Sequence, residues 1–135
     1  MFDTKIAIVL CNDLATWQKL NVTAFLTSGI VGANPGILGE PYEDAGGNTY
    51  APLVIQPIIV LSTDRDGIKT IYRRAMERQA RLALYIEDMF STGHDADNRA
   101  SVKQYQPDEL NVVGLALREA KNVVDRITKG AKMHE

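Results

Sequence analysis

The sequence predicts an α/β fold: a three-layer α/β/α sandwich with helices on both faces of a mixed, mostly parallel sheet. Two observations support this prediction. Four apolar runs have the length of strands, and stretches with helical periodicity fill the gaps between them. The chain has 135 residues, 45% of them hydrophobic and 24% charged, so it has the size and composition of one globular domain spanning residues 1–135.

The predicted strands are rich in Val, Ile and Leu and mostly lack polar alternation, as expected for strands that are covered on both faces. They span residues 5–10, 57–61, 82–87 and 112–117. The segment 49–55 is expected to form an additional edge strand or a hairpin arm, because Pro52 is tolerated mainly at a sheet edge.

Two helices are predicted by apolar residues at positions i, i+3, i+4 and i+7. The first stripe runs from Ile68 to Ala75, with Thr63 and Asp66 as an expected capping pair in front of it. The second covers residues 120–127, and Gly130 follows it as an expected C-terminal stop.

A third helix is expected between residues 13 and 28. Its apolar stripe consists of Leu14, Trp17, Ala24 and Phe25. At 100° per residue, Asn21 falls inside this stripe, whereas Lys19 is expected on the far side of the helix.

Two irregular stretches interrupt the pattern. Residues 32–50 carry five glycines and two prolines, and residues 93–110 are polar, with one helical turn expected near their middle. Connections of this length are uncommon in compact domains and often have a function of their own.

Composition limits the compartment and the partners. A single cysteine, Cys11, excludes an internal disulfide and is expected to be a buried, inert thiol in a cytoplasmic protein. The beginning of the chain lacks the features of a secretory signal, and no apolar run is long enough to cross a membrane. The net charge of −2 means that any contact with nucleic acid has to use a local basic patch.

No cofactor or metal is expected from the motifs. Phosphate-binding glycine loops and the nucleophile elbow of α/β-hydrolases are absent from the sequence. His94, Asp95 and Asp97 offer metal ligands, but a solvated loop is favoured because a second group of ligands is missing. Residues 65–81 carry a net charge of +4, which suits either a phosphate-binding face or, as we favour, the solvated face of an amphipathic helix.

The candidate site lies in the segment 84–92, LYIEDMFST. Ligands of open α/β sheets gather beyond the carboxyl ends of parallel strands, and Asp88 follows such a strand. A carboxylate there acts as a general base or orients water, and Thr92 can hold the same ligand. The alternative is that Asp88 only caps the following turn, and the spacing by itself favours this alternative.

Three segments carry a resemblance to a known family: KIAIVLCNDL with LNVTAFLTSG, LYIEDMFST, and VVGLALREAKNVVDRITKGAKM. In this order they resemble the uncharacterised family labelled domain of unknown function, number two thousand. That family resembles type II peptidyl-tRNA hydrolases in fold. The resemblance implies a homodimer, and it places Asp88, Thr92 and Lys19 at catalytic positions and Asn21 at a substrate-binding position.

The hydrolase signature is reduced in this chain. Asp13 and Leu14 match the D-L of the hydrolases, but the stretch after them lacks the G-K-x-A-A-Q-x-x-H-A pattern, and DMFST replaces D-A-G-x-T. The leading interpretation is therefore a hydrolase with an altered site around Asp88 and Thr92. The alternative is a non-catalytic module that binds a small molecule or a partner in the same cleft, and binding of tRNA is weakly supported.

Overall fold

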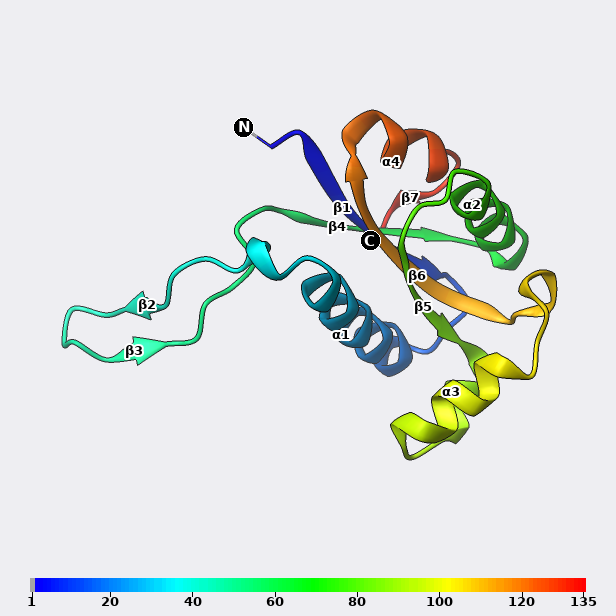
Figure 1. Ribbon diagram of the computed structural model, residues 1–135, viewed down its shortest axis with the longest axis horizontal. Helices are drawn as coiled ribbons and strands as arrows, with labels where there is room; N and C mark the ends of the chain where they lie inside the picture. Colours follow the sequence, from blue (N-terminus) through cyan, green and yellow to red (C-terminus); the bar gives the residue numbers. More distant parts are fainter. Residues whose placement is uncertain (1) are drawn as a thin grey trace.

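The computed structural model describes residues 2–135, which contain a five-stranded mixed sheet with helices on both faces (Figure 1). The strand order is β5-β6-β1-β4-β7. The strands are β1 (Thr4–Cys11), β4 (Ile58–Thr63), β5 (Leu82–Ile86), β6 (Val112–Ala120) and β7 (Lys132–Met133). All four apolar runs thus lie in one sheet, as predicted.

The prediction of a mostly parallel sheet was wrong. Strands β1 and β4 are parallel, whereas the pairs β1–β6, β5–β6 and β4–β7 are antiparallel. An apolar run indicates that a strand is covered on both faces, but it does not reveal the direction of its neighbour. The connection from β5 to β6 runs through α3 (Asp95–Lys103), which packs at the end of β5. Strand β6 then lies between β5 and β1 and is antiparallel to both.

Helix α1 (Thr16–Ala33) covers one face of the sheet, and α2 (Arg65–Glu77) and α4 (Lys121–Ile127) cover the other (Figure 1). The buried residues of α1 are Val22, Leu26 and Ile30. The predicted core stripe was therefore wrong for Trp17 and Phe25, which are 60% and 56% exposed, whereas Leu14, just before the helix, is buried as predicted. Helix α1 carries apolar residues on two faces, and periodicity alone did not reveal which of them meets the sheet.

The predictions for the other two helices are largely confirmed. Helix α2 buries Ile68, Ile71 and Ala75, and its N-cap is Asp64, whose carboxylate accepts the Gly67 N–H at 2.7 Å. The expected capping pair was therefore wrong: Asp64 and not Thr63 is the N-cap, and Gly67 and not Asp66 occupies the third helical position. Helix α4 ends at Ile127, and Gly130 follows it with a φ of +102°.

The two irregular stretches contain more structure than predicted. The second one forms α3, of nine residues, and the short helix η3 (Pro107–Glu109). The first one ends α1 and continues through η1 (Pro35–Ile37) into a hairpin of β2 (Tyr42–Glu43) and β3 (Thr49–Tyr50). This hairpin stands away from the body of the molecule (Figure 1), so segment 49–55 belongs to an arm.

The core is centred on β1 and β6. Residues 6–11 of β1 are almost fully buried, and Cys11 is among them, as predicted. Burial raises the pKa of the Cys11 thiol to about 11, although nearby Arg65 acts in the opposite direction. Within residues 2–135, no helix combines the length and the apolar character that a membrane span requires.

Candidate functional site

The loops after β1, β4 and β5 meet at one edge of the sheet. Strand β5 is antiparallel to β6, which is antiparallel to β1, so the carboxyl ends of β1, β4 and β5 lie together. Arg65 links these loops: its Nε lies 2.9 Å from Asp13 Oδ2, and its Nη1 lies 3.2 Å from Glu87 Oε2. These hydrogen bonds raise the pKa of Arg65, and the bond to Glu87 has the largest effect. Because Arg65 connects residues of three loops, this cluster is a structural clamp.

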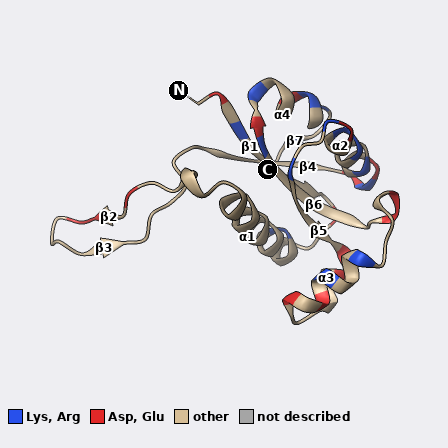
Figure 2. Cartoon of the chain, viewed as in Figure 1, with Lys and Arg blue, Asp and Glu red and all other residues tan. Residues whose placement is uncertain are grey.

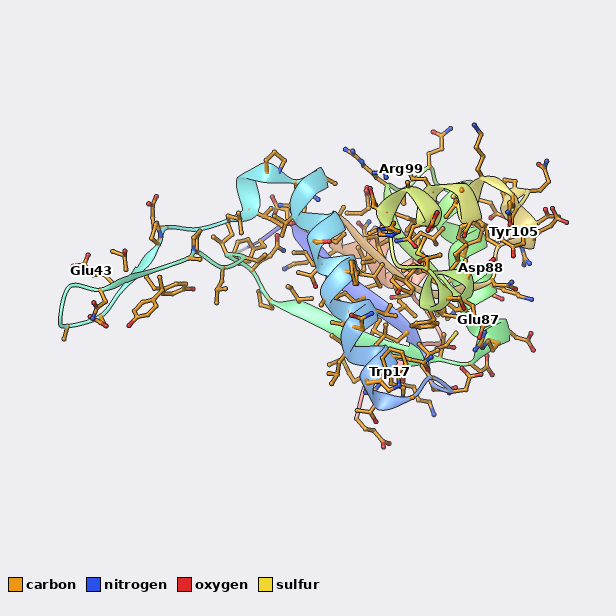
Figure 3. All side chains as sticks on the ribbon, turned by 90° about the horizontal axis from the view of Figure 1, so that it is seen from below. Trp17, Glu43, Glu87, Asp88, Arg99 and Tyr105 are labelled. Carbon is orange, nitrogen blue, oxygen red and sulfur yellow. The ribbon has the colours of Figure 1, made fainter. Side chains whose placement is uncertain are left out.

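Asp88 lies beside this clamp in the short helix η2 (Glu87–Ser91), but its carboxylate faces the segment after α3. Tyr105 Oη donates a hydrogen bond to Asp88 Oδ2 at 2.7 Å, and this bond is the main reason why the pKa of Tyr105 is raised. Figure 3 shows Asp88 and Tyr105 together on the side of the molecule that carries α3. The carboxylate expected to serve as a base is thus engaged by a residue of the 93–110 stretch.

Two of the predicted site residues meet in a cavity of about 270 Å³ between α1 and η2. Asn21 and Thr92 both line it, together with Phe90, His94 and Asn98, whereas neither Asp88 nor Lys19 lines it. The Thr92 hydroxyl oxygen lies 3.0 Å from the Met89 carbonyl oxygen and contacts the Asn98 side chain. The expected convergence therefore holds for Asn21 and Thr92 and fails for Asp88.

Aromatic rings form the walls of this cavity. The Trp17 and Phe90 rings meet edge to face at 6.0 Å, Tyr85 and Phe90 lie 5.3 Å apart, and Phe25 and Tyr85 lie 6.0 Å apart. Burial raises the pKa of Tyr85, and a hydrogen bond with the Asn21 amide acts against that shift. Trp17 and Phe25 are more than half exposed, so their rings are accessible at the mouth of the cavity.

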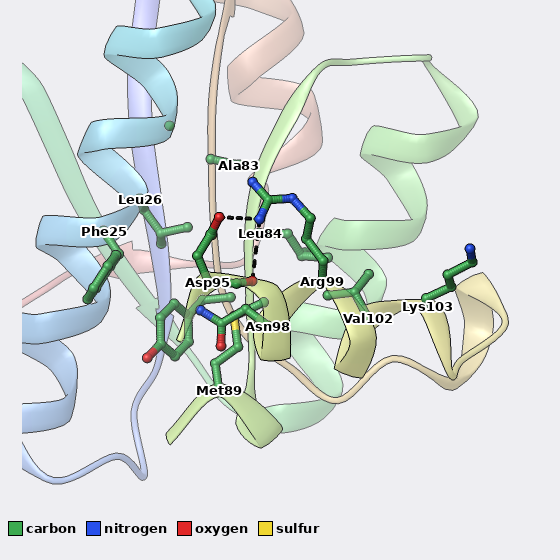
Figure 4. Close-up of a pocket in the computed structure, with 12 residues that line it drawn as sticks. Phe25, Leu26, Ala83, Leu84, Met89, Asp95, Asn98, Arg99, Val102 and Lys103 are labelled. Atoms are coloured by element: carbon green, nitrogen blue, oxygen red, sulfur yellow. Dashed lines mark hydrogen bonds and ion pairs between the residues drawn. The ribbon is translucent and has the colours of Figure 1, made fainter. Parts of the chain in front are cut away.

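A second cavity, of about 470 Å³, continues from the first along β5 (Figure 4). The two cavities share Phe25, Tyr85, Met89, Asp95 and Asn98. We call the combined space the α1–α3 groove: α1 forms one wall, α3 the other, and β5 the floor. Asp95 and Arg99 form an ion pair on its rim, and Lys103 lies one turn farther along α3.

The residues that could bind a metal do not gather in the structure. Within residues 2–135, no group of three His, Cys, Asp or Glu side chains has an arrangement that could hold an ion. His94 and Asp95 lie at the start of α3, where Asp95 pairs with Arg99 instead. The polar side chains that line the groove are the amides of Asn21 and Asn98, the Thr92 hydroxyl, the His94 ring, the Asp95–Arg99 ion pair and Lys103.

The sequence reasoning missed most of the groove. Trp17 and Phe25 were assigned to the core, although their spacing with Asn21, at i, i+4 and i+8, could have indicated a second functional face on α1. Asn98, which lines the groove, and Tyr105, which binds Asp88 outside it, were not predicted because their segment was expected to be mainly a loop.

Comparisons with known proteins give a family and no activity. A family model described as "Protein of unknown function (DUF2000)" matches residues 4–135. The chain is also similar to a solved protein of unknown function from Agrobacterium tumefaciens strain C58, with 57% sequence identity, a TM-score of 0.98 and coverage of 100% of both chains. No curated protein matches this sequence.

Proposed function

Because the chain belongs to the DUF2000 family of proteins of unknown function, we propose from its groove that it is a non-catalytic binding module. Its ligand is a small molecule with a planar apolar group and one acidic group. The observation that carries this proposal is the α1–α3 groove, which combines an aromatic and apolar lining with separate polar and charged side chains. Cavities of several hundred Å³ with this composition are typical of small-molecule sites.

The planar apolar part of the ligand follows from the rings. Trp17 and Phe25 are 60% and 56% exposed, although large aromatic side chains are normally mostly buried. A planar ligand laid against the exposed surface of these two rings gains stacking contacts and removes apolar surface from water. The side chains of Asn21 and Thr92 then supply the polar contacts that orient it.

The acidic group follows from the charges along the groove. Asp95 and Arg99 neutralise each other, and Lys103 adds one positive charge that has no carboxylate partner within the described residues. An anionic group at the α3 end of the ligand balances that charge at short range.

A hydrolase with an altered site is the competing function, and it depends on the resemblance to type II peptidyl-tRNA hydrolases. That resemblance makes Asp88, Thr92 and Lys19 catalytic and Asn21 substrate-binding. Three observations weigh against it: Tyr105 binds the Asp88 carboxylate, Asn98 contacts Thr92, and Lys19 does not line the cavity. A tRNA ligand is further disfavoured by the net charge of −2.

The test uses the fluorescence of Trp17, the only tryptophan of the chain. We expect the anionic aromatic probe 1-anilinonaphthalene-8-sulfonate to bind the wild type saturably and with one site per chain, and to change the Trp17 emission. Phe25→Ala should weaken binding about fivefold to tenfold, because one aromatic contact contributes on the order of 1 kcal/mol.

The matched control is Leu20→Ala. Leu20 is on the same helix and is 68% exposed, but it does not line the groove, so its truncation should leave the affinity unchanged. Non-saturable binding, or equal affinities for the wild type and Phe25→Ala, would contradict the proposal.

A further inference from the structure

The hairpin arm, residues 38–55, is a well-formed element that stands clear of the rest of the chain (Figures 1 and 3). At its base the two limbs of the arm are held together: Gly39 N–H donates to the Leu53 carbonyl, and Ile55 N–H donates to the carbonyl of Ile37 at the end of η1. Its two short strands, β2 and β3, pair only with each other within the described residues. Two-stranded ribbons of this kind are at best marginally stable in water without further support.

Asp44 holds the tip of the arm in one conformation. Its carboxylate accepts hydrogen bonds from Tyr50 Oη at 2.8 Å, from the Asn48 side chain at 3.0 Å, and from the backbone N–H groups of Gly46 and Asn48. These bonds lower the pKa of Asp44 to about 2, and the bond from Tyr50 has the largest effect. The tip is thus prepared for contact before any partner arrives.

The arm exposes apolar side chains that have no cover in the chain itself. Their exposed fractions range from 42% to 64%, and the residues are Leu38, Tyr42, Tyr50, Leu53 and Ile55. Contiguous exposed apolar surface on a soluble protein commonly marks a contact site. The arm also carries three carboxylates, Glu40, Glu43 and Asp44, and no Lys, Arg or His (Figure 2).

A complementary cavity lies directly at the base of the arm. It has a volume of about 440 Å³, and Phe2, Pro57 and Ile59 give it an apolar lining. Lysines stand on its rim: Lys5 Nζ lies 2.6 Å from Asp125 Oδ1, and Lys121 has no carboxylate partner within the described residues. This base cavity is thus apolar with surplus positive charge, whereas the arm is apolar with surplus negative charge.

We propose that the arm of one copy docks into the base cavity of a second copy, and that the second copy does the same in return. Gln56 and Pro57 continue directly from the arm and line the cavity, so the arm and the cavity adjoin. Two arms laid antiparallel therefore bring each tip to the other copy's cavity. This arrangement is a closed twofold dimer in which the same contact is made twice.

In this dimer the side chains of Tyr42 and Tyr50 cover the apolar lining, and Glu43 lies near Lys121 of the partner. The two ribbons also lie edge to edge, which pairs strands that are unpaired in a single copy. The proposal does not depend on the ligand of the α1–α3 groove, because the base cavity and that groove share no lining residue.

The experiment is a charge-swap cycle measured by sedimentation velocity over a range of concentrations. The wild type should sediment as a dimer of the 14.9 kDa chain. Glu43→Lys and Lys121→Glu should each weaken dimerisation roughly tenfold by placing like charges together, and the double variant should recover most of the loss. Lys69→Glu is the control: it makes the same charge change on the exposed face of α2 and should have no effect.

Carbodiimide cross-linking of mixed ¹⁴N and ¹⁵N protein provides a second measurement, in which a Glu43–Lys121 link should join a light chain to a heavy one. A wild type that remains monomeric, or that forms larger open assemblies, would overturn the proposal. A dimer that both single variants leave intact, or that the double variant does not restore, would also overturn it.

Discussion

Asp88 illustrates how one contact changes the expected chemistry of a residue. Ester hydrolysis requires a free base and a donor that stabilises the oxyanion, and Tyr105 donates its hydroxyl to the Asp88 carboxylate at 2.7 Å. We therefore expect an ester-release assay on a generic peptidyl-tRNA to show no turnover above the uncatalysed rate for the wild type. Asp88→Ala should behave in the same way. Tyr105→Phe frees the carboxylate but should also remain inactive, because Asp88 and Lys19 do not line the cavity that holds Thr92 and Asn21.

Asp97→Ala supplies the control for this assay, since Asp97 is an exposed carboxylate on α3. Robust turnover that is lost in Asp88→Ala and kept in Asp97→Ala would restore the hydrolase interpretation. Its catalytic set would then have to be sought on the Asp88 side of η2, since Asp88 does not line the cavity that Asn21 and Thr92 share.

Cys11 makes stability depend on alkaline pH. The pKa of its thiol is raised from 9.0 to about 11, so the folded state favours the protonated form. This contribution to the free energy of unfolding is complete below pH 9 and is lost as the pH rises from 9 to 11, by at most roughly 2–3 kcal/mol. Urea titrations at pH 7.5 to 10.5 should show this decrease in the wild type. Cys11→Ala, which carries no thiol, should show a smaller decrease in the free energy of unfolding over this pH range. An equal decrease in both proteins would contradict the attribution of the pH dependence to Cys11.

At the scale of the element, the contact between α1 and β6 depends on the absence of a side chain at Gly114. A Cβ there would lie 2.6 Å from Val22 Cγ1 and 3.1 Å from Leu26 Cδ1. Gly114→Ala should therefore lower the free energy of unfolding by about 1–3 kcal/mol, as overpacking in a core does. Chemical denaturation measures this change directly.

Gly32 offers the matched comparison, because a Cβ at this position of α1 meets no atom within 4 Å. Gly32→Ala should leave stability unchanged or raise it by up to about 1 kcal/mol, since alanine favours the helix. Equal effects of the two substitutions would mean that α1 is not packed closely on β6.

The same element explains why the sequence predicted the helices better than the site. The existence of α1 follows from its composition, but its orientation follows from Gly114, Val22 and Leu26, which meet across about 90 residues of sequence. Once these residues set the orientation, Trp17, Asn21 and Phe25 face the α1–α3 groove. The nature of the strands followed from local composition, whereas their directions depended on long-range pairing that no local pattern encodes.

At the scale of the whole molecule, the core is continuous. The buried apolar residues of both faces form one cluster that extends from Ile6 to Ile127. We propose that residues 1–135 fold as one domain and that the arm of this domain serves to bind a second copy of the chain. The compartment and the groove ligand do not follow from the fold, because function resides in specific side chains and not in the architecture that carries them.

The position of β6 in the sheet also determines when this protein can fold during synthesis. Strand β6 follows β1, β4 and β5 along the chain, yet it lies between β1 and β5 and is the only neighbour of β5 in the described sheet. A nascent chain that has emerged only as far as residue 110 consequently exposes the apolar edges of β1 and β5. Completion of the sheet has to wait until β6 leaves the ribosome, and unpaired strand edges of this kind favour aggregation during that interval.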